Sequence, residues 1–325
     1  MESESALDAT VAICTFNGSQ RIGRVLESLA CQQTRGETWE VLVVNNASTD
    51  ATDRVCRTLA RGFPVALRIV AEPRPGLSYA RGCAAQYARG KIVCFLDDDT
   101  PAEPNFVAAA VQAFQQYPDA GCLGGKIKPI WETPPTPLAL EVCDFALAIC
   151  DYGDQPFRYD PEAGGPVGAG ICVRRDVLLE AYANDSWAAG NPGPFGKKRV
   201  SGSEMALNAV IFQLGYSQWY VPNLVIHHII PEERMRLEYL ARLYESIGRG
   251  QAMVRRISDP KARHPILRRL IGIKDLARWL WGSVSGPGRR LKEKPPALRR
   301  QLHRLKQKQL WGRAMQAIAH NGSVG

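Results

Sequence analysis

Three consecutive aspartates, Asp97, Asp98 and Asp99, follow an apolar run that ends at Leu96. Neighbouring carboxylates repel one another and raise each other's pKa, so such a cluster is costly unless a cation lies beside it. Mg²⁺ and Mn²⁺ are commonly held by one or two carboxylates together with the phosphate oxygens of a nucleotide. The triplet therefore predicts a divalent-metal site, with an ordinary acidic loop as the competing interpretation.

Two other places in the sequence offer acid–base or metal-binding groups. Glu204 follows the glycine-containing segment 201–203 and opens a helical pattern. At such a position it can serve as a catalytic base or simply complement the helix dipole. His227 and His228 end an apolar, strand-like run. Because adjacent residues of a strand face opposite ways, at most one of the two histidines should point into a site.

Short apolar runs alternate with helix-like stretches through the first hundred residues. The runs predicted as strands are 10–15, 39–44, 66–70 and 91–96. The helix-like stretches between them are 19–30, 49–61 and 77–89. This alternation predicts an α/β fold whose parallel strands end at one edge of the sheet, where ligands bind.

Polar clusters follow three of these predicted strands, at residues 15–17, 45–50 and 97–99, and should therefore meet in space. Ser48 and Asp50 precede a predicted helix, so capping of that helix is an alternative to ligand binding. A later segment rich in glycine and proline, 190–196, is typical of a loop that closes over a bound ligand.

The net charge of +9 is unevenly distributed along the 325 residues. Residues 261–325 contain 16 lysines and arginines but only two acids, which gives them +14 and leaves −5 for the first 260 residues. A basic tail can bind nucleic acid or an anionic membrane. Binding of nucleic acid calls for basic residues interleaved with exposed aromatic residues, or for a known binding module. The aromatic residues of this tail are confined to Trp279, Trp281 and Trp311, so nucleic acid is disfavoured as the partner.

The basic tail contains two stretches with an apolar stripe. In the first stretch, apolar residues recur at steps of four and three positions: Ile266, Leu270, Ile273, Ala277 and Leu280. The second runs through Leu298, Leu302 and Leu305. Basic amphipathic helices of this kind favour an anionic membrane surface, and packing on the rest of the protein or formation of a homodimer are the alternatives.

The nine cysteines are odd in number and include no C-x-x-C pair, which favours reduced thiols in the cytoplasm over a disulfide scaffold or a zinc site. The acidic segment 1–10 lacks the features of a signal peptide, and no run reaches the roughly 18 apolar residues of a membrane span. We therefore expect a cytoplasmic protein that is peripheral on the inner face of the cell membrane where the tail binds lipid.

Together, these motifs resemble those of the family 2 inverting glycosyltransferases of the GT-A fold. The matching segments are, in order, 15–17, 43–50, 76–81, 95–99, 124–125, 168–170 with 174–175, 202–204 and 228–231. The resemblance implies a Rossmann-like GT-A catalytic domain with a mixed, mainly parallel central sheet at residues 1–235. A basic amphipathic helical C-terminal extension would follow at residues 236–325.

The resemblance also implies roles for individual residues. Those expected around the donor nucleotide are Thr15, Phe16, Asn17, Asn45, Asn46, Ser48, Asp50, Ser78, Arg81, Asp97 and Asp98. Asp99, with Asp97 and His228, would hold Mn²⁺ or Mg²⁺ against the diphosphate. Glu204 stands where the family usually has the aspartate that acts as base.

Asn45 departs from the family, which commonly has an aspartate that receives the nucleobase at this position. An amide can donate as well as accept a hydrogen bond, so the expectation of a UDP-sugar is weakened. The longer side chain of Glu204 keeps the chemistry of a base while changing its reach by about one carbon–carbon bond.

The implied activity is metal-dependent transfer of a sugar from a nucleoside diphosphate sugar to a hydroxyl, with inversion, in polysaccharide or glycoconjugate biosynthesis. The acceptor would be a carbohydrate or a lipid-linked molecule. A nonenzymatic nucleotide-sugar-binding module is one alternative, and it would not need Glu204. A nucleotidyltransferase is another, but it needs a glycine-rich phosphate loop after the first strand, where residues 15–18 contain one glycine.

Overall fold

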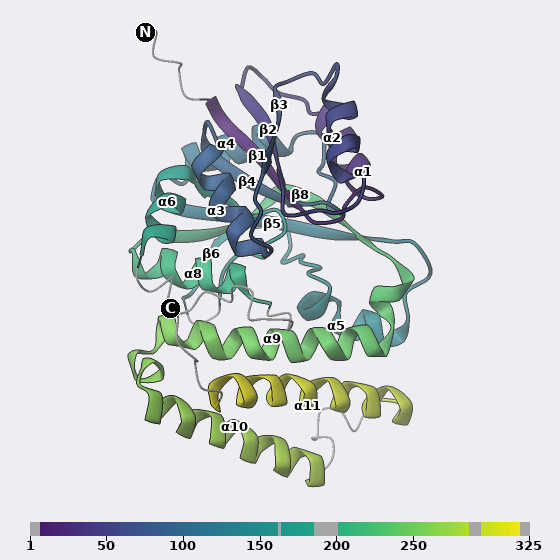
Figure 1. The fold of residues 1–325 in the computed structure, drawn as a ribbon, viewed down its shortest axis with the longest axis vertical. Coiled ribbons are helices and arrows are strands. Elements are labelled where there is room, and N and C mark those ends of the chain that lie inside the picture. Colours follow the sequence, from purple (N-terminus) through teal and green to yellow (C-terminus); the bar gives the residue numbers. More distant parts are fainter. Residues whose placement is uncertain (1–6, 162–163, 185–200, 286–293, 319–325) are drawn as a thin grey trace. The chain divides into compact units, whose positions relative to one another are not determined.

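The computed structural model describes residues 7–161, 164–184, 201–285 and 294–318 and contains a mixed sheet of eight strands (Figure 1). The strands lie in the order β3-β2-β1-β4-β7-β5-β8-β6. Their bounds are β1 (Leu7–Thr15), β2 (Trp39–Asn45), β3 (Leu67–Ala71), β4 (Gly90–Asp97), β5 (Ala120–Trp131), β6 (Phe157–Arg158), β7 (Cys172–Arg174) and β8 (Ser217–Ile230). The four strands predicted in the first hundred residues are all present.

Strand direction changes halfway across the sheet. The strands β3, β2, β1 and β4 are parallel to one another. Beyond them β7 pairs antiparallel with both β4 and β5, and β6 pairs antiparallel with β8. The expected α/β fold with a mixed sheet is therefore confirmed, and its parallel half carries the three polar strand ends.

Helices cover both faces of the parallel strands because successive residues of a buried strand point to opposite sides. The helices α1 (Ile22–Ala30) and α4 (Phe106–Gln116) pack on the face that carries Ala9, Val11 and Ile13 of β1. The helices α3 (Leu77–Tyr87) and α6 (Arg175–Ala183) pack together and contact β1, β2 and β4. Helix α2 (Thr52–Ala60) connects β2 to β3 along the chain and contacts α1.

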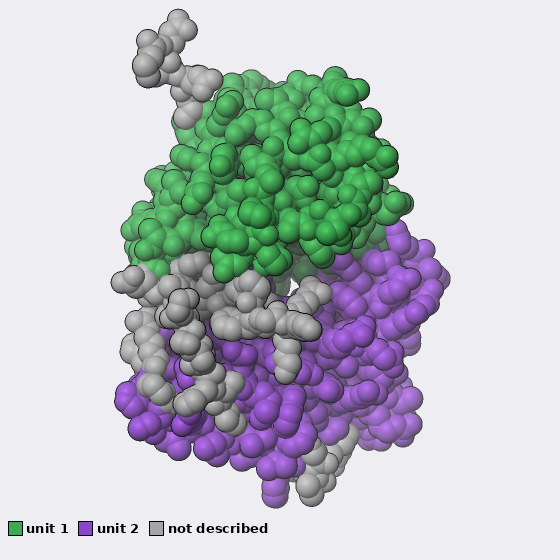
Figure 2. Space-filling view, viewed as in Figure 1, with its two compact units in different colours: residues 1–130, 148–184, 207–229 green, residues 131–147, 185–206, 230–325 purple. Residues whose placement is uncertain are grey.

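The chain divides into two compact units (Figure 2). The first comprises residues 1–130, 148–184 and 207–229 and contains nearly all of the sheet. The second comprises residues 131–147, 185–206 and 230–325. Two internal segments thus group with the C-terminal helices, and the predicted domain boundary at residue 235 stays a prediction. The predicted closing loop, 190–196, lies outside the described residues.

The second unit is helical. Its elements are α5 (Pro137–Ala146), the first turn of α8 (Ser203–Gln213), η1 (Glu232–Met235), α9 (Leu237–Ser258), η2 (Pro260–Arg263), α10 (Pro265–Ser285) and α11 (Pro296–Ile318). The predicted helical C-terminal extension is therefore confirmed. In the part of the chain that the structure describes, no helix combines the length and apolar character that crossing a bilayer requires.

The close approach of β4 to β1 generates a prediction about Gly90. A Cβ at this position would overlap the backbone of Ala9 and Thr10, so Gly90→Ala should lower the free energy of unfolding by about 3 kcal/mol. A Cβ added to Gly23, within α1, would meet only open space. Gly23→Ala should therefore raise the free energy of unfolding by about 0.5 kcal/mol. Urea denaturation of both variants measures the difference, and similar stabilities would contradict the register between β1 and β4.

Candidate functional site

Three polar strand ends come together in the first unit because their strands are parallel and in register. Thr15 at the end of β1 lies opposite Asn45 at the end of β2, and Cys14 lies opposite Asp97 at the end of β4. The loops that follow these strands therefore begin side by side. The edge of the sheet predicted to bind a ligand is the edge where these groups meet.

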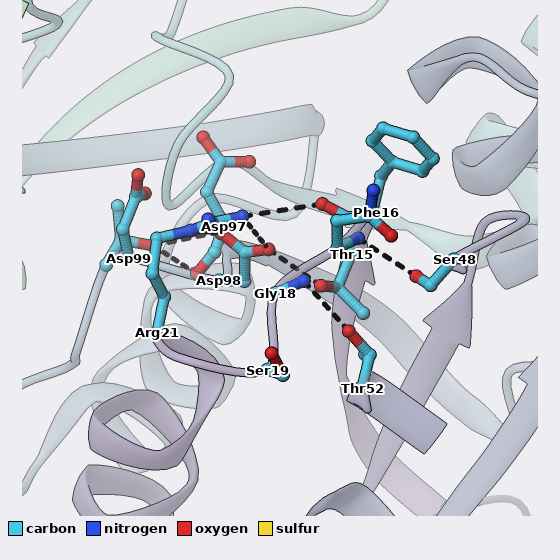
Figure 3. Close-up of polar contacts among 12 residues, drawn as sticks. Thr15, Phe16, Gly18, Ser19, Arg21, Ser48, Thr52, Asp97, Asp98 and Asp99 are labelled. Carbon is cyan, nitrogen blue, oxygen red and sulfur yellow. Dashed lines mark hydrogen bonds and ion pairs between the residues drawn. The ribbon is translucent and has the colours of Figure 1, made fainter. Parts of the chain in front are cut away.

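Asp98 is held by two residues of the β1–α1 region (Figure 3). The Thr15 hydroxyl donates to Asp98 Oδ2 at 2.7 Å. Arg21 donates from Nε to Asp98 Oδ1 and from Nη2 to Asp98 Oδ2, each at 2.9 Å, and these bonds raise the pKa of Arg21. The middle aspartate of the triplet is thus neutralised by a bidentate guanidinium, which leaves less repulsion for its neighbours.

Arg21 was missed by the sequence analysis. Adjacent carboxylates need a nearby cation, and the sequence pattern indicates only a metal ion for that role. Arg21 lies 77 positions before Asp98, so its ion pair depends on how the loop after β1 folds back. The same guanidinium also donates from Nη2 to the carbonyl of Phe16 at 3.4 Å, while the Phe16 ring is 54% exposed.

Gly18 allows this loop to pass close to Asp98. A Cβ on Gly18 would overlap the Thr15 hydroxyl and the Asp98 carboxylate. Its N–H donates to the Thr52 hydroxyl at 2.9 Å, which ties the loop to the start of α2. Only glycine therefore fits between the first strand end and the aspartates.

Asn17, Ser48 and Asp50 join the loops that follow β1 and β2. Asn17 has a φ of +50°, a conformation that asparagine tolerates, and its N–H donates to Ser48 Oγ at 3.0 Å. Asp50 accepts hydrogen bonds from the Thr52 hydroxyl and backbone N–H and from the Ser19 N–H, and these lower the pKa of Asp50. Asp50 thus both steadies the start of α2 and fastens the β1–α1 loop.

Asn45 and Asn46 have different surroundings although they are adjacent. Asn45 is half-buried, and its Oδ1 accepts the N–H of Ser48 at 3.2 Å. Asn46 is buried, donates to the carbonyls of Glu72 and Arg74 at 3.1 and 2.7 Å, and accepts from the Gly76 N–H at 2.8 Å. Asn46 therefore positions the segment that leads into α3.

The start of α3 contributes Ser78 and Arg81, both buried beneath this edge. Arg81 Nη2 donates to the carbonyl of Gly168 at 3.1 Å, and the guanidinium lies 5.4 Å from the centre of the Phe95 ring. A buried guanidinium is expensive to desolvate, so such a group is held where an anion or a dipole can be recognised. The expected role of Arg81 at the nucleotide stays a prediction.

His228 and Asp99 lie together at the end of β8. Their side chains are both buried, and His228 Nε2 is 3.8 Å from Asp99 Oδ1. The Ile229 N–H donates to the Asp99 carbonyl at 3.0 Å, which fixes the backbone beside β8. His227 points the other way and pairs with Glu103 at 2.7 Å. Strand alternation therefore separates the two histidines as expected, and His228 is the one that faces the aspartates.

Asp99 and His228 offer a carboxylate and an imidazole to a divalent ion. Neighbouring ligands that each lie about 2.1 Å from one ion are about 3 Å apart, so the 3.8 Å between Asp99 Oδ1 and His228 Nε2 would have to shorten for both to bind the same ion. Within the described ranges, no group of three or more His, Cys, Asp or Glu side chains is arranged to hold a metal. An ion at this pair would thus take its other ligands from donor phosphates or water, as is usual for Mg²⁺.

Asp97 and Glu204 complete the predicted set. The backbone N–H of Asp97 donates to the Thr100 hydroxyl at 2.8 Å, and this turn directs the triplet away from β4. Glu204 is half-buried in the first turn of α8 and belongs to the second unit, so its role remains a prediction. Within that unit, the Ser201 hydroxyl lies 2.9 Å from that of Ser246, so α9 holds the segment before Glu204.

The chain is similar in sequence to known proteins. Residues 10–180 match the family model described as glycosyl transferase family 2. The chain is 27% identical over 259 residues to the glucosyl-dolichyl phosphate glucuronosyltransferase of Haloferax volcanii, and the match covers 78% of each chain. It is 28% identical over 245 residues to the glycosyltransferase AglE of the same organism, covering 75% of this chain and 73% of AglE.

The fold is similar to that of a crystal structure of GalNAc-T7 with UDP, GalNAc and Mn²⁺. The TM-score is 0.53 at 18% sequence identity. The match covers 75% of this chain and 48% of the other, so this chain spans about half the length of that structure. This similarity confirms the GT-A-like fold.

The Arg21–Asp98 pair generates a prediction about stability. Asp98→Asn should lower the free energy of unfolding by about 2 kcal/mol, because the amide cannot accept all three hydrogen bonds and leaves Arg21 poorly paired. Asp53→Asn is the matched control, since its pair with Arg57 is exposed on both sides and should contribute no more than about 0.5 kcal/mol. Equal losses for the two variants in urea denaturation would contradict a structural role for Asp98.

Proposed function

This chain belongs to glycosyl transferase family 2, and we propose that it transfers a sugar from a nucleoside diphosphate sugar to an acceptor hydroxyl with inversion at the anomeric carbon. The observation that carries the proposal is the buried Asp99–His228 pair at the edge where three polar strand ends meet. A diphosphate bound there would contact a metal-binding pair beside a preformed loop.

The donor nucleotide is proposed to bind along the ends of β1 and β2. Thr15, Phe16, Asn17, Asn45 and Asp50 would surround the base and ribose, with Ser48 and Asn46 supporting them. The exposed Phe16 ring offers a surface on which a base can stack. Asn45 already accepts from Ser48 through its Oδ1, so its NH₂ group is available to donate to a base carbonyl.

The diphosphate is proposed to lie beside Asp99, His228 and Asp97, which would hold Mn²⁺ or Mg²⁺. The chemistry that such an ion supplies when bound is neutralisation of charge on the departing nucleoside diphosphate. Arg81 would add a second positive charge, and Ser78 would line the same region. Asp98, held by Arg21 and Thr15, would keep the triplet in place.

Glu204 is proposed to take the proton from the acceptor hydroxyl as the oxygen attacks the anomeric carbon. The bond to the nucleoside diphosphate breaks in the same step, so configuration inverts. Positioning and electrostatic stabilisation of the leaving group would supply most of the rate enhancement. The contact between Ser201 and Ser246 supports this role, since it steadies the backbone just before Glu204.

The acceptor is proposed to be a carbohydrate or a lipid-linked molecule in polysaccharide or glycoconjugate biosynthesis. One relative is named a glucosyl-dolichyl phosphate glucuronosyltransferase, and the lipid-linked sugar to which that name refers supports this class. A cytoplasmic location is proposed because all nine cysteines are free thiols. A screen of UDP-, GDP- and dTDP-sugars for donor hydrolysis in Mn²⁺ tests enzyme class, base and sugar together, and no hydrolysis of any donor would favour a binding module.

Glu204→Gln tests the proposed base. The amide cannot accept a proton, so transfer should fall by about 10²–10⁴-fold while the affinity for the donor stays the same. Glu238→Gln is the control, because Glu238 is also in the first turn of a helix and shares any interaction with the helix dipole. Radiolabelled sugar transfer and donor titration measure the two quantities. Full activity of Glu204→Gln would remove Glu204 from this role.

Asp99→Asn tests the proposed metal pair. Nucleoside diphosphate affinity measured by calorimetry in Mn²⁺ should fall at least about tenfold, to the value that the unmodified protein shows in EDTA. Asp53→Asn should keep the Mn²⁺ effect, because Asp53 pairs with Arg57 on the surface of α2. The assignment fails if Asp99→Asn melts normally and still binds the nucleotide more tightly when Mn²⁺ is added.

A further inference from the structure

Helix α10 carries a stripe of exposed apolar side chains. Ile266, Leu270, Ile273 and Leu280 are 53–63% exposed, and Trp281 is 73% exposed. Steps of four, three and seven residues place them on one side of a helix that turns once every 3.6 residues. Isolated exposed apolar residues need no explanation, but a continuous stripe along a helix marks a binding surface.

The opposite side of α10 fixes how the helix is rotated. Asp275 is 2% exposed and accepts hydrogen bonds from Arg278 at 3.2 Å and from Arg313 of α11 at 3.3 Å. Trp279 packs against Trp311 of α11, with 5.0 Å between their ring centres. A rotation of α10 about its own axis that turned the stripe toward α11 would expose Trp279 and break the hydrogen bond between Asp275 and Arg313. The stripe therefore stays outward in the folded unit.

The other basic stretch of the tail does not present such a surface. In α11, Leu305 is fully buried, and Leu298 and Leu302 are half-buried. α11 packs against both α9 and α10, and α9 approaches it closely because Gly248 and Gly312 carry no Cβ (Figure 1). The apolar side chains of α11 are therefore buried or half-buried against neighbouring helices, whereas the apolar stripe of α10 is exposed.

The charges beside the stripe indicate what covers it. Arg269 and Lys274 are exposed along its two edges, and Arg278 is exposed nearby. Asp275, the one acid of α10, is buried on the far side. An occupant must therefore be apolar in the middle and anionic around it. A second copy docked symmetrically would place these cations against one another, which disfavours a dimer through this face.

We propose that α10 docks the protein onto an anionic lipid surface. The helix lies in the plane of the interface, with Ile266, Leu270, Ile273 and Leu280 at the boundary of the acyl chains. Arg269 and Lys274 contact lipid phosphates, and Trp281 sits at headgroup level, where tryptophan is favoured. The inference does not depend on the proposed transferase chemistry.

Flotation of the full-length protein with phosphatidylcholine vesicles, with and without phosphatidylglycerol, tests the proposal. The protein should bind the anionic vesicles, and Ile273→Glu should weaken partitioning by about tenfold or more by placing a charge in the stripe. Leu140→Glu, which changes a residue of α5 that is 55% exposed, should bind like the unmodified protein. Arg269→Glu and Lys274→Glu should each weaken binding by about fivefold or more.

Trp281 gives a second readout. Its emission should shift to the blue on anionic vesicles, and Trp281→Phe should remove most of that shift while leaving the thermal melt unchanged. Absence of binding by the unmodified protein would overturn the proposal, as would equal binding by a normally melting Ile273→Glu. Light scattering that detects a dimer broken by Ile273→Glu, without vesicle binding, would assign the stripe to a second copy instead.

Discussion

The repulsion among three adjacent carboxylates at the end of β4 is the constraint on which the site depends. The structure places two of these carboxylates beside side chains of other segments. Asp98 is neutralised by the bidentate Arg21 and by Thr15, and Asp99 lies beside His228. The backbone N–H of Asp97 donates to the Thr100 hydroxyl and closes a turn. Because Asp98 is neutralised within the protein, it contributes less to the repulsion within the triplet.

Satisfying Asp98 shapes the neighbouring loops. The loop after β1 must fold back to bring Arg21 to the aspartate, and it passes so close that residue 18 has to be glycine. Hydrogen bonds from Gly18 to Thr52 and from Ser19 to Asp50 then fasten this loop to the loop after β2. The nucleotide that we propose to bind here would meet loops already fastened by hydrogen bonds, so less conformational entropy would be lost on binding.

The C-terminal helices contribute in two distinct ways. The contact of Ser246 in α9 with Ser201 steadies the approach to Glu204. The exposed stripe of α10 is the surface that we propose for lipid, and α11 packs against the other side of the helix. Within the second unit, α9 thus supports the candidate base, while α10 of the basic tail keeps an apolar stripe exposed.

The sequence by itself determined the four strands of the first hundred residues, the helices between them and the order of the site motifs, because apolar periodicity and polar strand ends are local patterns. It also indicated that one histidine of the pair would face the site, since side chains alternate along a strand. Only the tertiary structure decided that Arg21 is the cation of Asp98, that Asn46 is committed to backbone groups, and that α10 rather than α11 keeps its apolar stripe exposed. Those outcomes depend on contacts between residues far apart in the chain, which composition and spacing do not encode.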